Sequence, residues 1–248
     1  MVSILTGYGI NADRELASAF ARTGVSVTSV HLARVFENPS LLDEYRIIAF
    51  PGGFSFGDHL GSGLALAGLV RTRLAEPITR FVERGGLVIG ICNGFQVLVK
   101  SGLLPDFSGT RRPEASLVHN DCGKFVDRWV SLRPGKAART SPWLAGVPPM
   151  RLPVRHGEGR FVLGDSGLQT SAVEHAAFHY ESDDNPNGSL EDIAGVTDRS
   201  GRIIGLMPHP EAAVDPLLDP HWRRHMGSDP PPAFRIFTNG TAAARESM

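Results

Sequence analysis

Cysteine is scarce in this sequence, with only Cys92 and Cys122 among 248 residues. Two thiols cannot build the disulfide framework of a small secreted protein, so we expect a reducing, cytoplasmic environment. Long apolar runs are also missing, because the longest, such as Leu87–Ile91 and residues 64–70, are too short to span a bilayer. The N-terminus lacks a basic region followed by an apolar run, and no signal peptide is expected.

An excess of one charge is absent too. The net charge is −1 and lysine and arginine form no long run, which argues against a nucleic-acid or membrane surface. Neither a Walker A loop nor a G-x-G-x-x-G motif occurs, so the chain shows no standard nucleotide-triphosphate loop. Two histidine pairs at i, i+4 spacing, His175/His179 and His221/His225, lack the glutamate and third ligand of a helical metal site. We therefore predict no metal site.

The first half of the chain alternates strand-like and helix-like segments. Apolar strands are predicted at Val2–Thr6, residues 25–31, residues 46–50 and Leu87–Ile91. Helices are predicted at residues 12–22, with Asn11 as N-cap, and at residues 63–73, 76–84 and Asn93–Ser101. This rhythm predicts an α/β fold with a mostly parallel central sheet flanked by helices.

The second half predicts antiparallel additions to that sheet. Strands at residues 116–121 and 124–132 are expected to form one hairpin, and strands at 192–197 and 202–207 another. Residues 215–232 are rich in proline and are expected to be irregular. Residues 233–248 suit either a terminal helix broken at Asn239-Gly240 or a frayed tail. A single domain over residues 1–248, with an irregular or helical tail from about 219, is the simplest organisation.

Three unusual segments follow predicted strands, namely PGGFSFGD after residues 46–50, CNGFQ after Leu87–Ile91 and PHPE after residues 202–207. Ligands of open parallel sheets collect outside the carboxyl ends of the strands, so these segments are expected to meet. Cys92 lies between a strand and a helix, where a strained turn exposes a nucleophile and the helix N-terminus favours a thiolate. The alternative is a buried, inert cysteine.

His209 and Glu211 are two residues apart in an extended segment, so their side chains face the same way. A carboxylate that orients an imidazole gives the general base that a cysteine nucleophile needs, although a bare H-x-E is more often a solvated pair. Attack on a carboxamide also creates an oxyanion that needs N–H donors. The Gly53 and Asn93 N–H groups are the candidates, although Pro-Gly-Gly alone can be an ordinary turn.

Longer strings carry a resemblance to a known family. They are FPGGFSFGDHLGSG, GICNGFQVLVKSGLLP, RHGEGRF, NPNGSLEDIAG and GLMPHPEAAVDPLL, and the resemblance runs from about Ile4 to Leu218. With them the chain resembles the triad-type, class I glutamine amidotransferases, and within these the glutaminase subunits of phosphoribosylformylglycinamidine synthase. The resemblance implies a single-domain, flavodoxin-like fold.

The resemblance also implies roles for individual residues. Cys92 would attack the carboxamide of glutamine, His209 would move protons and Glu211 would hold His209. The oxyanion would lie between the N–H groups of Gly53 and Asn93. Independently of the resemblance, Gln96 is an expected substrate contact because it lies one helical turn beyond the nucleophile, and Phe54 is the other expected contact. The chain departs from the usual family pattern at Ala212, Phe56, His59 and Cys122.

A partner is implied in the same way. The ammonia would pass to a synthetase subunit that uses ATP and magnesium to convert formylglycinamide ribonucleotide to the amidine in purine synthesis. No cofactor is expected in this chain, and the sequence leaves open whether a third small subunit joins. A stand-alone hydrolase and a non-catalytic module on the same fold are the competing hypotheses.

Overall fold

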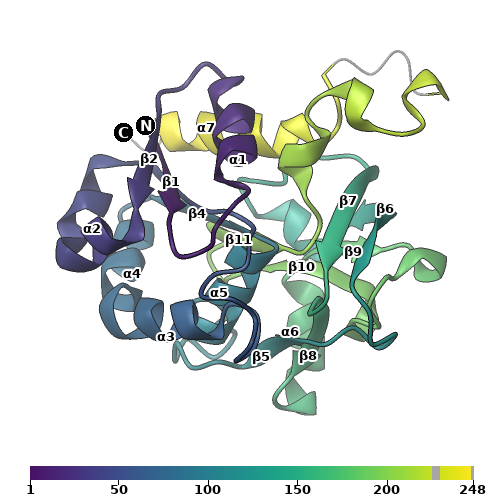
Figure 1. Ribbon diagram of the computed structural model, residues 1–248, viewed down its shortest axis with the longest axis horizontal. Helices are drawn as coiled ribbons and strands as arrows, with labels where there is room; N and C mark the ends of the chain where they lie inside the picture. Colours follow the sequence, from purple (N-terminus) through teal and green to yellow (C-terminus); the bar gives the residue numbers. More distant parts are fainter. Residues whose placement is uncertain (225–229, 247–248) are drawn as a thin grey trace.

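The computed structural model describes residues 1–224 and 230–246. Those residues form a nine-stranded sheet with helices on both faces (Figure 1). In spatial order the strands are β2 (Val27–His31), β1 (Val2–Thr6), β3 (Ile47–Phe50), β4 (Leu87–Ile91), β11 (Ile203–Leu206), β10 (Ile193–Thr197), β9 (Ala176–Tyr180), β6 (Val126–Pro134) and β7 (Met150–His156). A small second sheet pairs β5 (Ala115–Val118) with β8 (Arg160–Leu163).

The sheet changes direction at β11. From β2 to β11 neighbouring strands are parallel, whereas from β11 to β7 they are antiparallel. The α-helices of the described residues are α1 (Asp13–Ala21), α2 (Leu32–Glu37), α3 (Leu64–Arg73), α4 (Ala75–Glu83), α5 (Asn93–Ser101), α6 (Gln169–Glu174) and α7 (Phe234–Glu246). α1 and α7 pack together on one face, and α3 and α5 pack on the other (Figure 1). The predicted α/β class and antiparallel additions are confirmed.

The centre of the sheet explains the apolar runs of the sequence. Every residue of β3, β4 and β11 is buried, because helices cover both faces, and the three strands read IIAF, LVIGI and IIGL. β4 lies between the other two, with Phe50 in register with Gly90 and Leu206 with Ile91. The segments that follow these three strands therefore leave the sheet side by side.

Two local predictions are wrong. The N-cap of α1 is Ala12, and no side chain caps that helix, so Asn11 is not the cap. The hairpin predicted around residues 122–123 does not form, because β5 pairs with β8 while β6 pairs with β7 and β9. A turn signal reverses the chain, but the partners of a strand depend on which faces are buried. The hairpin of β10 and β11 is confirmed.

The end of the described chain is more regular than predicted. α7 continues without a break through Asn239 and Gly240. Gly240 faces the ring of Trp143 so closely that a Cβ atom would approach its Cζ3 to 2.2 Å, and Asn239 Nδ2 donates to the Trp143 and Ala145 carbonyls. The Asn-Gly pair thus packs against the segment of Trp143 and does not break the helix. Before α7 lie two short 3-10 turns, η7 (Pro216–Leu218) and η8 (Trp222–Arg224).

No helix in the described ranges is long and apolar enough to cross a membrane.

Two glycine-to-alanine substitutions test how tightly α5 is packed on the sheet. A Cβ atom on Gly94 would lie 2.0 Å from the Phe50 carbonyl oxygen, so the backbone of Gly94→Ala must shift. We expect a loss of roughly 3 kcal/mol or more in the free energy of unfolding. The control is Gly68→Ala in α3, where a Cβ atom meets nothing within 4 Å. It should gain up to about 1 kcal/mol. Urea titrations of both variants measure the difference, and equal stabilities would contradict the packing.

Candidate active site

Cys92 lies at the tip of a sharp turn between β4 and α5. Its backbone has φ 51° and ψ −106°, a conformation that L-residues rarely adopt and that stores strain. The turn requires small neighbours, because a Cβ atom on Gly90 would lie 2.5 Å from Leu98 Cδ1 and one on Gly94 would meet the Phe50 carbonyl. The thiol is thereby held at the start of α5, and its Sγ lies 3.6 Å from the Arg155 carbonyl oxygen.

The His209–Glu211 pair lies beyond the end of β11. Pro210 begins the 3-10 turn η6 (Pro210–Ala213), which brings Glu211 back beside the imidazole. His209 Nδ1 lies 2.6 Å from Glu211 Oε1, and both side chains are buried. The backbone N–H of His209 donates to the Pro153 carbonyl, which fixes the segment to β7. This geometry matches an imidazole oriented by a carboxylate.

The imidazole and the thiol share one site. Gly52 lies between them, since a Cβ atom there would lie 3.0 Å from His209 Cε1 and 3.6 Å from Cys92 Cβ. His209 Nε2 is buried without a hydrogen-bond partner among the described residues. Burial alone would lower the pKa of His209, but the charges of Glu211 and then Cys92 outweigh it and raise the pKa to about 10. The imidazole is therefore cationic at neutral pH.

Gly53 and Asn93 bring two backbone N–H groups to the same edge. Gly53 has φ 151°, and a Cβ atom there would lie 2.7 Å from Ile10 Cα, so only glycine fits. Gly53 pairs with Ile10 in an isolated antiparallel bridge, and the hydrogen bonds on either side of that bridge are donated by the N–H groups of Asn11 and Phe54. The N–H of Gly53 takes part in neither bond. The N–H of Asn93 is in the first turn of α5, where helices have no internal partner for it. The oxyanion role of both groups stays a prediction.

The two remaining candidates lie in different surroundings. Phe54 is exposed and lines the cavity into which Cys92 and His209 open. Gln96 is buried, and its side chain bonds Asn93 and the Glu158 carbonyl. The structure places Phe54 where a ligand would touch it and Gln96 behind that surface. Their contact with substrate stays a prediction.

The cavity has a volume of about 350 Å³ and charged walls that the sequence did not indicate. Its lining is Asn11, Ala12, Glu15, Gly53, Phe54, Cys92, Phe125, Asp127, Arg155 and His209. Arg155 Nη2 pairs with Glu15 Oε2 at 3.1 Å, so the wall offers both signs of charge. A zwitterionic amino acid would find a partner for each of its charged groups there. Only the presence of Arg155 in the RHGEGRF string hinted at this wall.

His156, in the same string, is buried beside the site and remains neutral. Its pKa is lowered to about 4 by burial and by the positive charge of His209. Its Nδ1 lies 3.0 Å from Asn120 Oδ1, while Nε2 has no partner in the described part of the chain. The neutral ring of His156 thus adds no second positive charge beside His209.

Of the two histidine pairs, only His175/His179 lies wholly in the described residues, and it is not on a helix. His175 is the C-cap that follows α6 and His179 lies in β9, so their spacing is not helical. His221 Nδ1 lies 2.8 Å from Arg151 Nη1, and His225 lies outside the described residues. Cys122 is exposed in a turn, away from the cavity.

Comparison with known proteins agrees with this geometry. A family model for the CobB/CobQ-like glutamine amidotransferase domain matches residues 1–242. A phosphoribosylformylglycinamidine synthase subunit PurQ from Dehalococcoides mccartyi is 40% identical, over 98% of this chain and 97% of the relative. The PurQ of Cereibacter sphaeroides is also 40% identical, over 97% and 98%. This chain belongs to the PurQ family of glutamine amidotransferases.

A solved structure of PurLQS from Thermotoga maritima contains a similar fold. It matches with a TM-score of 0.75 and 31% identity, covering 97% of each chain. The fold of a PurQ-type amidotransferase therefore extends over nearly the whole molecule.

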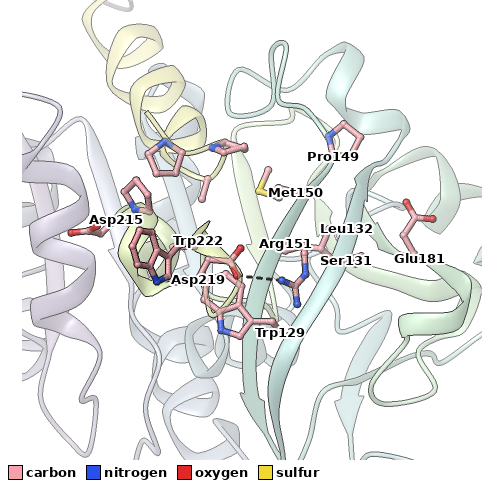
Figure 2. A pocket seen from close by; sticks show the side chains of 15 residues that line it. Trp129, Ser131, Leu132, Pro149, Met150, Arg151, Glu181, Asp215, Asp219 and Trp222 are labelled. Atoms are coloured by element: carbon pink, nitrogen blue, oxygen red, sulfur yellow. Dashed lines mark hydrogen bonds and ion pairs between the residues drawn. The ribbon is translucent and has the colours of Figure 1, made fainter. Parts of the chain in front are cut away.

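A second cavity, also about 350 Å³, lies away from these residues between the β6–β7 pair and the segment before α7 (Figure 2). Trp129 and Trp222 line it, and the ion pair of Arg151 and Asp219 crosses it with Nη1 3.2 Å from Oδ1 (Figure 2). It contains no residue of the predicted site.

The charge of Glu211 should set the pKa of His209. In Glu211→Gln the amide keeps the shape but loses the charge, so we expect the pKa of His209 to fall well below about 10. NMR titration of the His209 ring carbon in labelled protein measures it directly. Asp127→Asn, on the same cavity but not against His209, should leave it unchanged. An unchanged pKa in Glu211→Gln would show that Glu211 does not stabilise the cation.

Proposed function

We propose that the chain is the glutaminase subunit of phosphoribosylformylglycinamidine synthase. The observation that carries the proposal is the meeting of Cys92 with the His209–Glu211 pair at one cavity, at the ends of β4 and β11. The relatives named PurQ at 40% identity support the same activity. The subunit would hydrolyse glutamine and supply ammonia to a synthetase subunit for amidine formation in purine biosynthesis.

The reaction follows from the charges of the site. In the resting site the Cys92 thiolate lies beside the imidazolium of His209, and the thiolate attacks the side-chain carboxamide of glutamine. The N–H groups of Gly53 and Asn93 stabilise the resulting oxyanion. The imidazolium of His209 donates its proton to the nitrogen, the C–N bond breaks, and ammonia leaves.

A second half-reaction restores the enzyme. Neutral His209 accepts a proton from water, which attacks the thioester and breaks the C–S bond. Glutamate leaves and the thiolate re-forms beside the imidazolium. Glu211 holds the ring throughout and balances its charge. This sequence needs no metal or cofactor from this chain, and we assign ATP and magnesium to the synthetase subunit.

Exposed apolar side chains beside the cavity suit a protein partner. Phe54, Phe56, Leu60 and Leu64 lie on one loop and its continuation into α3, and all are exposed. Clusters of this kind on a surface mark interaction sites. We propose that the synthetase docks on this loop, that a third small subunit joins the complex, and that the complex works in the cytoplasm.

The nucleophile is tested by an amidine assay with the synthetase present. Cys92→Ala should lose glutamine-dependent synthesis by at least about 10³-fold yet keep synthesis from added ammonia. Cys122→Ala, an exposed thiol, should retain both. A Cys92→Ala variant that still used glutamine would refute the nucleophile. High glutaminase activity without any partner would favour a stand-alone hydrolase, and a thiol unreactive toward glutamine-like alkylating agents would favour a non-catalytic module.

A charged substitution tests whether the synthetase docks on the loop that carries Phe54, Phe56 and Leu60. Leu60 is 77% exposed, and docking of the synthetase would bury it. Leu60→Asp would place a carboxylate in that interface, so the Kd for the synthetase should rise at least about 10-fold. Leu217→Asp, 67% exposed at another surface, serves as the control. Calorimetry or surface plasmon resonance measures both. Equal affinities would place the partner elsewhere.

A further inference from the structure

α5 carries a polar stripe in surroundings that are otherwise apolar. Asn93, Gln96 and Lys100 recur at spacings of three and four residues, which places them on one face of the helix. Asn93 and Gln96 are 1% and 3% exposed. Burying an amide costs free energy unless its polar atoms are hydrogen-bonded. The hydrogen-bond partners of these side chains therefore show which segments of the chain the polar face of α5 holds in place.

A directed chain of hydrogen bonds starts at the loop after β7. Gln96 Nε2 donates to the Glu158 carbonyl at 2.6 Å, and Asn93 Nδ2 donates to Gln96 Oε1 at 2.9 Å. Asn93 Oδ1 accepts the backbone N–H of Ser55 at 3.2 Å. A carbonyl only accepts and a backbone N–H only donates, so the two ends fix how both amides are turned. Asn93 links the nucleophile helix to Ser55.

Ser55 belongs to the segment that carries Gly53. On its other side that segment pairs with residues 8–11, because the N–H of Phe54 donates to the Gly9 carbonyl at 3.0 Å and that of Phe56 to the Tyr8 carbonyl at 2.6 Å. Asn93 holds the segment from the side of α5. The place of the Gly53 N–H is thus set by these two attachments.

A second attachment fixes the far end of the same loop. The N–H of Ser62 donates to Glu158 Oε2 at 3.1 Å, and Lys100 Nζ donates to the Ser62 carbonyl at 2.7 Å. Lys100 and Glu158 also form an ion pair at 3.2 Å, with side chains only 10% and 9% exposed. The first and last turns of α5 therefore each hold one end of the segment from 55 to 62.

We propose that the side-chain amide of Asn93 positions the oxyanion site. It fixes Ser55, and with it the Gly53 N–H, relative to the N–H of Asn93 itself. One residue thereby supplies one donor through its backbone and places the other through its side chain. The inference rests on the proposed function, because that function assigns the two N–H groups to the tetrahedral intermediate.

Asn93→Ala tests the proposal, since it keeps the backbone N–H and removes both side-chain bonds. In the complex with the synthetase, kcat for glutamine hydrolysis should fall about 30-fold or more, with KM changed less than about 3-fold. The rate at which iodoacetamide alkylates Cys92 should stay within about 2-fold, because displacement of iodide forms no oxyanion. A matched control is Asn239→Ala in α7, which removes an amide bonded to two carbonyls away from the cavity and should leave kcat unchanged.

The outcomes separate this role from others. A wild-type kcat in Asn93→Ala would overturn the proposal, and so would a joint fall of kcat, alkylation rate and thermal stability, which marks a structural role. Should the variant not fold, amide exchange in the wild type decides, because a Ser55 N–H held by Asn93 must exchange slowly. Exchange at the rate of an open loop would overturn it. Wild-type protein that makes no amidine from glutamine would instead refute the proposed function.

Discussion

The contact on which the site depends is the approach of α5 to the carboxyl end of β3. Gly94 lies against the Phe50 carbonyl so closely that no side chain fits between them. The chain must therefore turn sharply from β4 into α5, and Cys92 takes up a strained conformation with positive φ at that turn. The same approach brings the start of α5 beside the segment from Pro51 to Ser55. This close packing thus places the nucleophile and the Asn93 N–H, and it brings the segment of Gly53 within reach of the Asn93 side chain.

A buried charge pair depends on that placement. Glu211 is almost inaccessible and its Oε2 has no partner in the described ranges, so the carboxylate relies on the imidazolium of His209. A carboxylate buried in this way is costly unless it is paired. The raised pKa of His209 reflects the same dependence, because the negative charges around it outweigh its burial. The His209–Glu211 pair therefore contributes both to the stability of the fold and to proton transfer.

Local signals predicted the elements around the nucleophile well and the distant pairings poorly. β4 and α5 have the bounds predicted for them, because an apolar run, a glycine-flanked turn and a helical period are all local. The predicted hairpin at residues 122–123 failed, and α6, β7 and β9 were not predicted at all. The pairings of β5, β7 and β9 depend on burial across the whole sheet, which local patterns do not show. Gly240 shows the same limit, since its neighbour Trp143 turns a helix-breaking signal into a packing site.

The sequence by itself determined the chemistry that is available. It contains a cysteine at a strand–helix turn, an imidazole two residues from a carboxylate, and a Pro-Gly-Gly segment after an apolar strand, all of which depend on covalent spacing. Tertiary structure alone decided which groups surround them. The charged wall of Glu15 and Arg155 and the chain from Ser55 through Asn93 to Glu158 join residues 38 to 140 positions apart. Such contacts follow from the order and register of the strands, which burial across the whole sheet sets and no local pattern contains.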